Sequence, residues 1–150
     1  MAITLEIKGL SQLISMAEKY PAIAEKHINM AINRSLVRLW GEEKIQAPVY
    51  IGRLRDDWKL DVGRFQGKLS SNAPYAMDIE NGRGPHAVSG TELMGWAAKK
   101  GLNPWAVAKS ITKKGTKANP FFARSINAQA DNIQKEFDTA LQDIIKEINS

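Results

Sequence analysis

The chain has 150 residues, which predicts a single domain spanning residues 1–150. It contains no cysteine, which excludes disulfide bonds, cysteine-ligated zinc and a thiol nucleophile, and is typical of a protein made in a reducing cytoplasm. Its net charge of +5 favours contact with nucleic acid or with an acidic protein surface.

The N-terminal segment is predicted to form a strand followed by a short helix. Residues 2–8 alternate apolar and polar side chains, which predicts a half-buried strand that ends at Gly9. This segment lacks the basic region and long apolar run of a signal peptide, and no apolar stretch of the chain has the length of a membrane span, so we expect no membrane partner. Ser11 is the expected N-cap of the helix, and Pro21 is expected to end it and to open the next one.

A long amphipathic helix is predicted from Ala22 to about Gln46. Arg34 and Arg38 lie off its apolar stripe and are expected in water. Gly41 weakens the helix by about 1 kcal/mol relative to alanine, which predicts a bend or a frayed turn there. The apolar stripe consists of Ile28, Ala31, Ile32, Ser35, Leu36, Leu39 and Trp40.

The segment from Pro48 to Gly82 predicts a turn, a β-hairpin and a short helix. Apolar residues alternate from Trp58 onward, as they do in a half-buried strand, and Gln66-Gly67 is the expected hairpin turn. Pro74 is expected at the first position of the short helix, because its missing N–H is no loss there.

Two further short helices are predicted in the middle of the chain. After a loop over Arg83–Gly90, one helix is expected around Leu93 and ends near Gly101. The next is expected to begin at Asn103-Pro104, with the asparagine as N-cap, and to stop at Gly115.

The last predicted helix is long and amphipathic. It begins after Pro120, and its apolar residues recur at intervals of three and four as far as Ile148. The expected fold class is therefore α+β, with a small, mostly antiparallel sheet packed against the long N-terminal and C-terminal helices and extra short helices in the middle.

A set of short motifs occurs in a fixed order between Pro48 and Phe122, over roughly half of the chain. Its members are Pro48, Gly52, Arg53, Leu54, Tyr75, Ala76, Glu80, Gly82, Pro120, Phe121 and Phe122. The set resembles the tail-completion or head–tail joining proteins of long-tailed bacteriophages, which are neck or minor tail components. Arg83 departs from the threonine that often follows the Glu-x-Gly glycine in that family, and the segment from Gly84 to Gly115 is longer than in the shortest members.

The resemblance implies a structural virion protein without enzymatic activity, cofactor or small-molecule substrate. It implies a homo-oligomer, most simply a six-fold ring, that completes the tail and joins it to the head as a connector. The implied partners are tail-terminator, tail-tube or head-completion proteins, with genomic DNA in the lumen. The implied location is the head–tail junction of the virion, and the host cytoplasm during assembly. The expected interface residues are Gly52, Arg53, Leu54 and Arg55, together with Arg83, Gly84, Pro85 and His86.

No catalytic or metal-binding constellation is predicted. His27 and His86 are far apart in the sequence and are expected to be structural or solvated. Glu80 is expected to fix a loop, through Arg53 or through a backbone N–H, and not to act in catalysis.

The alternative function is that of a small basic nucleic-acid-binding protein. No acidic residue interrupts the basic run from Lys99 to Arg124. The lysines can follow phosphates by charge alone, or they can be solvated helix ends favoured by the helix dipole. Trp96 and Trp105 lie beside the run and are expected in the core. The Lys99–Lys117 face consists of Lys99, Lys100, Lys109, Lys113, Lys114 and Lys117.

Overall fold

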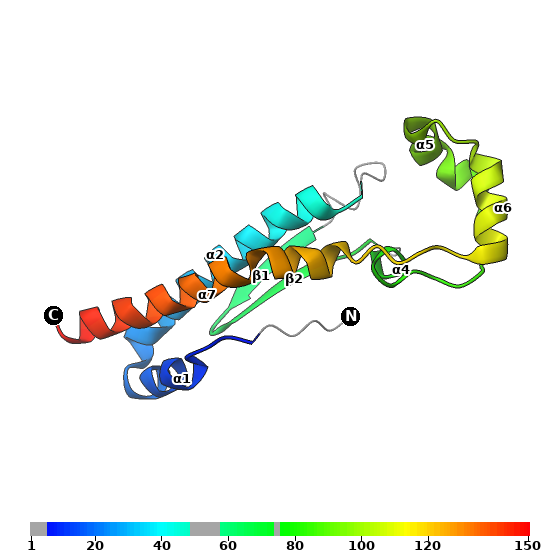
Figure 1. Cartoon of the computed structure of the whole chain (residues 1–150). Coiled ribbons are helices and arrows are strands. Elements are labelled where there is room, and N and C mark those ends of the chain that lie inside the picture. Colours follow the sequence, from blue (N-terminus) through cyan, green and yellow to red (C-terminus); the bar gives the residue numbers. More distant parts are fainter. Residues whose placement is uncertain (1–5, 49–57, 74–75) are drawn as a thin grey trace.

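The computed structural model describes residues 6–48, 58–73 and 76–150. Its elements are α1 (Leu10–Lys19), α2 (Pro21–Gln46), β1 (Trp58–Gly63), β2 (Gln66–Ser71), α4 (Ala76–Asn81), α5 (Gly90–Lys100), α6 (Pro104–Lys114) and α7 (Phe121–Ile148). They form a mostly helical α+β fold in which a two-stranded antiparallel hairpin packs on the two long helices, as the sequence predicted. Figure 1 shows an elongated body made by α1, α2, the hairpin and α7, from one end of which α5 and α6 project. In the described part of the chain, no helix is long and apolar enough to cross a membrane.

The body is organised around α2 and α7, which lie side by side and antiparallel (Figure 1). Pairs of side chains join them along their whole length, from Lys26 with Glu147 at one end to Gln46 with Arg124 at the other. Their facing stripes bury apolar side chains, which removes apolar surface from water and holds the pair together. The buried apolar residues of these stripes are Ala24, Ile28, Ala31 and Leu36 of α2, and Phe121, Ile126, Ile133, Ala140 and Ile144 of α7.

The core of the body has two clusters, one towards each end. One is built on Leu13, Ala24, Ile28 and Ile144, so it joins α1 to the start of α2 and the end of α7. The other is built on Ala47, Ala73 and Phe121, at the opposite end of the long helices. Trp58 of β1 stacks on Phe122 of α7 beside this second cluster, with ring centroids 5.3 Å apart, and so ties the hairpin to α7.

The hairpin forms where it was predicted, but its turn does not. Trp58 pairs with Ser71 and Gly63 with Gln66, so the turn is Arg64-Phe65 and the predicted turn at Gln66-Gly67 is wrong. Gly67 lies in β2 because the strand approaches α2 closely there: a Cβ at Gly67 would lie 2.6 Å from Leu36 Cδ1. The glycine serves packing and not turn geometry.

The hairpin turn is held by the long helix beneath it. Phe65 has a positive φ of 56°, which is uncommon for a residue other than glycine. Its backbone N–H donates to Asn29 Oδ1 of α2 at 2.9 Å, and Arg64 pairs with Glu25 of the same helix at 2.9 Å. Tertiary contacts with α2 therefore fix the turn.

The N-terminal predictions need two corrections. Residues 6–8 do not form a strand, so this part of the strand predicted over residues 2–8 is wrong. The rest of that strand, Ala2–Leu5, lies outside the described residues. Ser11 lies inside α1 and is not its N-cap. The cap position is Gly9, whose positive φ of 81° suits glycine and whose carbonyl accepts from Leu13 N–H. Pro21 opens α2, as predicted.

The α2 helix continues through Gly41 to Gln46, so the predicted fraying at that glycine is wrong. Arg34 and Arg38 are exposed as predicted, yet both reach across to Glu136 of α7, at 3.8 and 3.0 Å. The helix pair therefore carries charge contacts along its rim as well as apolar contacts along its centre.

Local signals placed the short middle helices well. Asn103 caps α6 by accepting from Trp105 N–H and Ala106 N–H, and Gly115 ends it. The α5 helix ends at Gly101 as predicted, but it begins at Gly90, earlier than its apolar residues suggested. Pro74, predicted at the start of the helix now seen as α4, lies outside the described residues.

Candidate interaction surface

We call residues 83–119 the arm; it comprises α5, α6 and the extended segments that connect them to the body. The two helices pack on each other away from the body, as Figure 1 shows. Leu93, Ala97 and Ala108 form their small buried contact. The indole of Trp105 covers Gly90 so closely that a Cβ there would lie 2.9 Å from the ring, so this packing requires a glycine.

Two extended segments attach the arm to the body, and a single antiparallel bridge joins them. Arg83 N–H donates to the Thr116 carbonyl at 3.1 Å, and Thr116 N–H donates back to the Arg83 carbonyl at 2.8 Å. The Arg83 guanidinium also pairs with Asp78 of α4 at 3.1 Å. Gly115 has a φ of 76° and a ψ of −163°, and a Cβ there would collide with the Arg83 carbonyl. This crossing point therefore depends on glycine.

The structure describes one of the two groups of predicted interface residues. Arg83, Gly84, Pro85 and His86 all lie in the first segment of this attachment, where His86 Nδ1 is 2.8 Å from the carbonyl oxygen of Gly84. Gly84 and Pro85 are exposed, while Arg83 is engaged with the body. The other predicted group, Gly52–Arg55, lies outside the described residues.

Several residues that carry the family resemblance meet where the arm leaves the body. Glu80 is 4% exposed, and its carboxylate accepts from Phe122 N–H at 2.8 Å and from Ala123 N–H at 3.1 Å. Gly82, with a φ of 71°, packs against the backbone of residues 116–118. The predicted structural role of Glu80 through backbone N–H groups is confirmed, although its target, the first turn of α7, was not foreseen.

The arm exposes large apolar side chains. Met94 is 49% exposed and Leu102 is 47% exposed. Trp105 is 60% exposed, so its predicted place in the core is wrong, although one part of its ring covers Gly90. Trp96 is half-buried. The small contact between α5 and α6 thus leaves large parts of Met94, Leu102 and Trp105 exposed.

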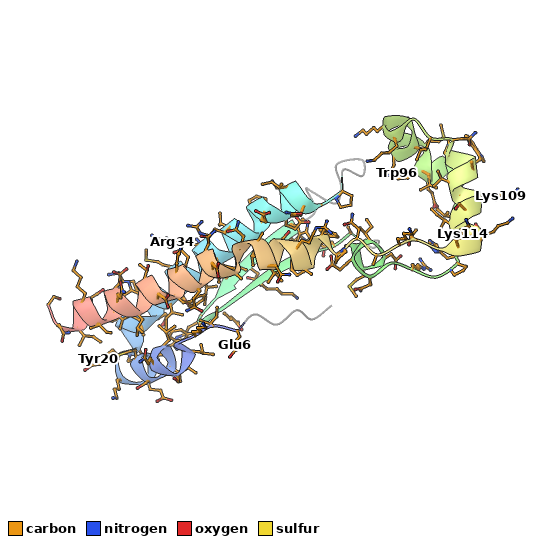
Figure 2. All side chains as sticks on the ribbon, in the orientation of Figure 1. Glu6, Tyr20, Arg34, Trp96, Lys109 and Lys114 are labelled. Atoms are coloured by element: carbon orange, nitrogen blue, oxygen red, sulfur yellow. The ribbon has the colours of Figure 1, made fainter. Side chains whose placement is uncertain are left out.

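All six lysines of the Lys99–Lys117 face are exposed and lie on the arm. Lys109 and Lys114 point away from the body in Figure 2. The ion pairs in the described part of the chain involve none of these six lysines. The structure therefore exposes on one projecting feature the lysines that the sequence presented only as a run.

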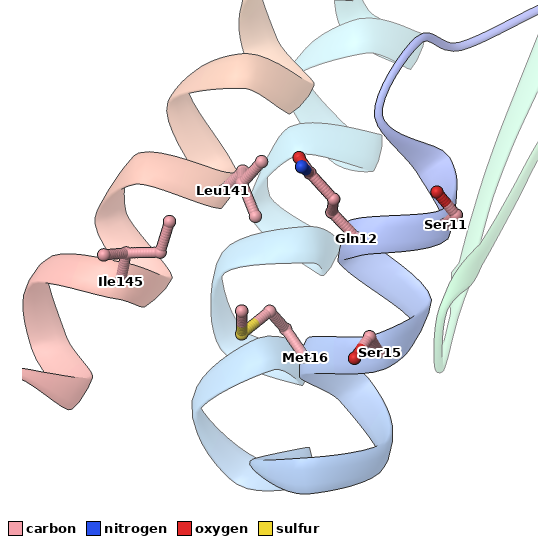
Figure 3. A pocket seen from close by; sticks show the side chains of 6 residues that line it. All are labelled: Ser11, Gln12, Ser15, Met16, Leu141 and Ile145. Atoms are coloured by element: carbon pink, nitrogen blue, oxygen red, sulfur yellow. The ribbon is translucent and has the colours of Figure 1, made fainter.

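A shallow hollow of about 290 Å³ lies at the other end of the body, between α1 and α7 (Figure 3). Met16, Leu141 and Ile145 supply its apolar wall, and Ser11, Gln12 and Ser15 supply its polar edge. No titratable side chain lines it, so it offers no acid–base chemistry, and no predicted site residue belongs to it.

The titratable residues of the body serve the fold. His27 and Lys26 both hydrogen-bond to Glu147, and these bonds, with that of His27 foremost, hold the pKa of Glu147 below its ordinary value of 4.5. This arrangement fastens the end of α7 to the start of α2. Among the residues that the structure describes, no group of three or more histidine, aspartate or glutamate side chains could hold a metal ion.

Comparison of the chain with protein-family models, curated proteins and solved structures found no match.

Proposed function

We propose that this chain is a structural virion protein of a long-tailed bacteriophage that oligomerises as a ring at the head–tail junction. There it completes the tail and joins it to the head, with tail-terminator, tail-tube or head-completion proteins as its partners. The proposal assigns it no enzymatic activity, no cofactor and no small-molecule substrate.

The arm is the observation that carries the proposal. It spans residues 83–119, yet its helices pack mainly on each other and expose Met94, Leu102 and Trp105. The body exposes large apolar side chains too, such as Ile45, so it is their position on a projecting feature that makes those of the arm candidates for an interface. Tryptophan is also among the residues that contribute most at protein interfaces.

The position of the arm also suits a ring. Ring closure needs a heterologous interface, in which one patch meets a different patch on the next copy. A feature that projects from one end of an elongated body meets that need, because it can reach a neighbour without clashing with its own body (Figure 1). The motif residues Glu80 and Gly82 support the point from which it projects.

Light scattering over a range of protein concentrations tests the proposal. We expect the unmodified chain to form one closed oligomer, whose symmetry negative-stain electron microscopy then shows directly. The double substitution Met94→Glu and Leu102→Glu places charges on the exposed apolar part of the arm and is expected to reduce the mass to that of one chain.

Met30→Glu is the matched control, because Met30 lies on α2 and is 43% exposed, close to the exposure of Met94. It is expected to leave the oligomer intact. A chain that stays monomeric at every concentration would contradict self-assembly, and dissociation by Met30→Glu alone would place the interface on the body and not on the arm.

A further inference from the structure

The positive charge of the chain is concentrated on the arm. Residues 83–119 contain seven basic residues and one acidic residue, Glu92, so this segment carries +6 against +5 for the whole chain, and all other residues together carry −1. The basic residues are Arg83, Lys99, Lys100, Lys109, Lys113, Lys114 and Lys117.

Several basic side chains of the body are neutralised by ion pairs, whereas the arm lysines are not, within the described residues. Lys26, Arg34, Arg38 and Arg64 of the body each pair with a glutamate. In the part of the chain that the structure describes, the six arm lysines form no ion pair and are all exposed. Unpaired like charges held close together repel one another, so a ligand that neutralises them gains affinity from that relief.

One face of α6 arranges an aromatic ring and two of these lysines in a row. Trp105, Lys109 and Lys113 stand four residues apart, so they share one face and are separated by about 6 Å of rise at each step. All three are exposed, while Ala108, which lies between Trp105 and Lys109 in the sequence, is buried where α6 packs on α5. Lys114 and Lys117 extend the positive surface towards the attachment of the arm.

From this arrangement we infer that the arm binds the phosphate backbone of duplex DNA without sequence preference. Duplex DNA carries one negative charge per about 1.7 Å of its axis, a density that a row of lysines can neutralise along its length. Lysine meets phosphate as a point charge; it can also contact guanine, but a base sequence is otherwise read mainly by arginine, asparagine or glutamine at base edges. The exposed face of α6 has none of these three, since Asn103 is occupied in capping the helix.

This inference rests on the charge and exposure of the arm and holds whether or not the chain forms a ring. An acidic protein surface is the competing partner, but such surfaces also display donors and cations that require acceptors in return. The arm has a single carboxylate, Glu92, to offer them.

Fluorescence anisotropy with a labelled duplex of random sequence, about 30 base pairs long, tests the inference. We expect log K to fall linearly with log salt between about 50 and 200 mM, because bound lysines release counterions. The triple substitution Lys109→Gln, Lys113→Gln and Lys114→Gln is expected to weaken binding about tenfold or more at the lowest salt. It should also reduce the salt slope by up to about 2.7, which corresponds to about 0.9 per lost phosphate contact.

The matched control removes the same charge from the body, through Lys59→Gln, Lys68→Gln and Lys135→Gln, all of which are exposed and unpaired in the described structure. This control is expected to leave the salt slope nearly unchanged. Trp105→Phe gives a second readout, since it should remove most of the change in tryptophan fluorescence that accompanies DNA binding.

Three results would overturn the inference: no binding at the lowest salt, an equal loss from the arm and body triple variants, or displacement of the duplex by polyglutamate as effectively as by unlabelled DNA. The last result would identify the arm as a site for acidic protein. Light scattering on the arm triple variant separates this inference from the proposed function, because the variant should lose DNA while keeping the oligomeric mass of the unmodified chain.

Discussion

Glu80 shows how a single side chain can join two distant segments. The residue before α7 is Pro120, which has no side-chain acceptor, so the first N–H groups of that helix need a partner from elsewhere. Glu80 of α4 supplies it, with both carboxylate oxygens engaged and almost no exposure. A negative charge at this position is also favoured by the helix dipole. The motif residues Glu80 and Phe122 are thus separated in the sequence but adjacent in the fold.

Substitution of Glu80 tests this role. Glu80→Ala leaves the partly buried N–H groups of Phe122 and Ala123 without their acceptor, and we expect it to lower the free energy of unfolding by about 1–3 kcal/mol. Urea denaturation measures the loss. Glu18→Ala, at an exposed position of α1 that forms no ion pair or side-chain hydrogen bond with the described residues, should change stability by less than about 0.5 kcal/mol. Equal effects would show that Glu80 has no special role.

Substitutions of Gly115 and Gly84 provide a second test at the level of single residues, this time of the bridge between Arg83 and Thr116. Gly115→Ala forces a side chain into a backbone conformation that is essentially restricted to glycine and against the Arg83 carbonyl, at a cost of about 1–3 kcal/mol. We expect faster hydrogen exchange at the amides of Arg83 and Thr116, because their bridge is disrupted. A Cβ on Gly84 would meet nothing within 4 Å, so Gly84→Ala should leave that exchange unchanged.

At the level of elements, the sequence predicted what local chemistry determines. Pro21, Asn103 and Gly115 act within one turn of their own helices, and each marked a helix limit correctly. The hairpin turn was misplaced because a glycine looks the same in a sequence whether it serves a turn or close packing. Gly67 serves packing against α2, and the turn at Phe65 is held by Asn29, some 36 residues away in the chain.

Two glycine substitutions with opposite expected signs test these element contacts. Gly41→Ala on the exposed face of α2 adds a Cβ that meets nothing within 4 Å, so it should raise the free energy of unfolding by about 0.5–1 kcal/mol. Gly67→Ala pushes β2 away from Ile32 and Leu36 and should lower it by about 1–3 kcal/mol. Chemical denaturation of both variants measures these two changes in the free energy of unfolding. Stabilisation by Gly67→Ala would contradict the close packing of the hairpin on α2.

The fastening of α7 to α2 should depend on pH. Hydrogen bonds with His27 and Lys26 lower the pKa of Glu147 in the folded protein, so its carboxylate contributes stability at pH values above the unfolded pKa. That contribution is lost as the pH falls from about 4.5 through the lowered folded pKa. We expect Glu147→Gln to be less stable than the unmodified chain at neutral pH, and the difference to shrink in this acidic range. A difference that stays constant with pH would contradict this assignment.

At the scale of the whole molecule, the separation of arm and body was not predictable. An amphipathic stripe shows that one face of a helix is buried, but it does not show which element covers it. The short helices were therefore foreseen, while their packing on each other away from the body was not. The lysine run was visible in the sequence, but its exposure and its lack of ion pairs with other described residues depend on the folded structure. The predicted interface at Gly52–Arg55 stays a prediction, since it lies outside the described residues.

The two parts should differ in local stability. The body has two apolar clusters, whereas the arm buries only Leu93, Ala97 and Ala108 among its apolar residues. We expect amides of α5 and α6 to exchange with solvent faster than those in the centres of α2 and α7, because regions with few buried contacts open more easily. Hydrogen exchange followed by mass spectrometry measures this at protein concentrations low enough to keep the chain monomeric. Equal protection throughout would mean that arm and body unfold as one unit.

The uneven placement of charge also makes the molecule an electric dipole whose positive pole is the arm. Two copies approaching with their arms together repel each other, whereas an approach of arm to body is free of that repulsion, so the long-range field orients the encounter before any contact forms. Any assembly that gathers several arms at one place accumulates this repulsion with each added copy. Its growth should therefore depend on ionic strength, because salt or a bound polyanion screens the repulsion between arms and so allows the last copies to join.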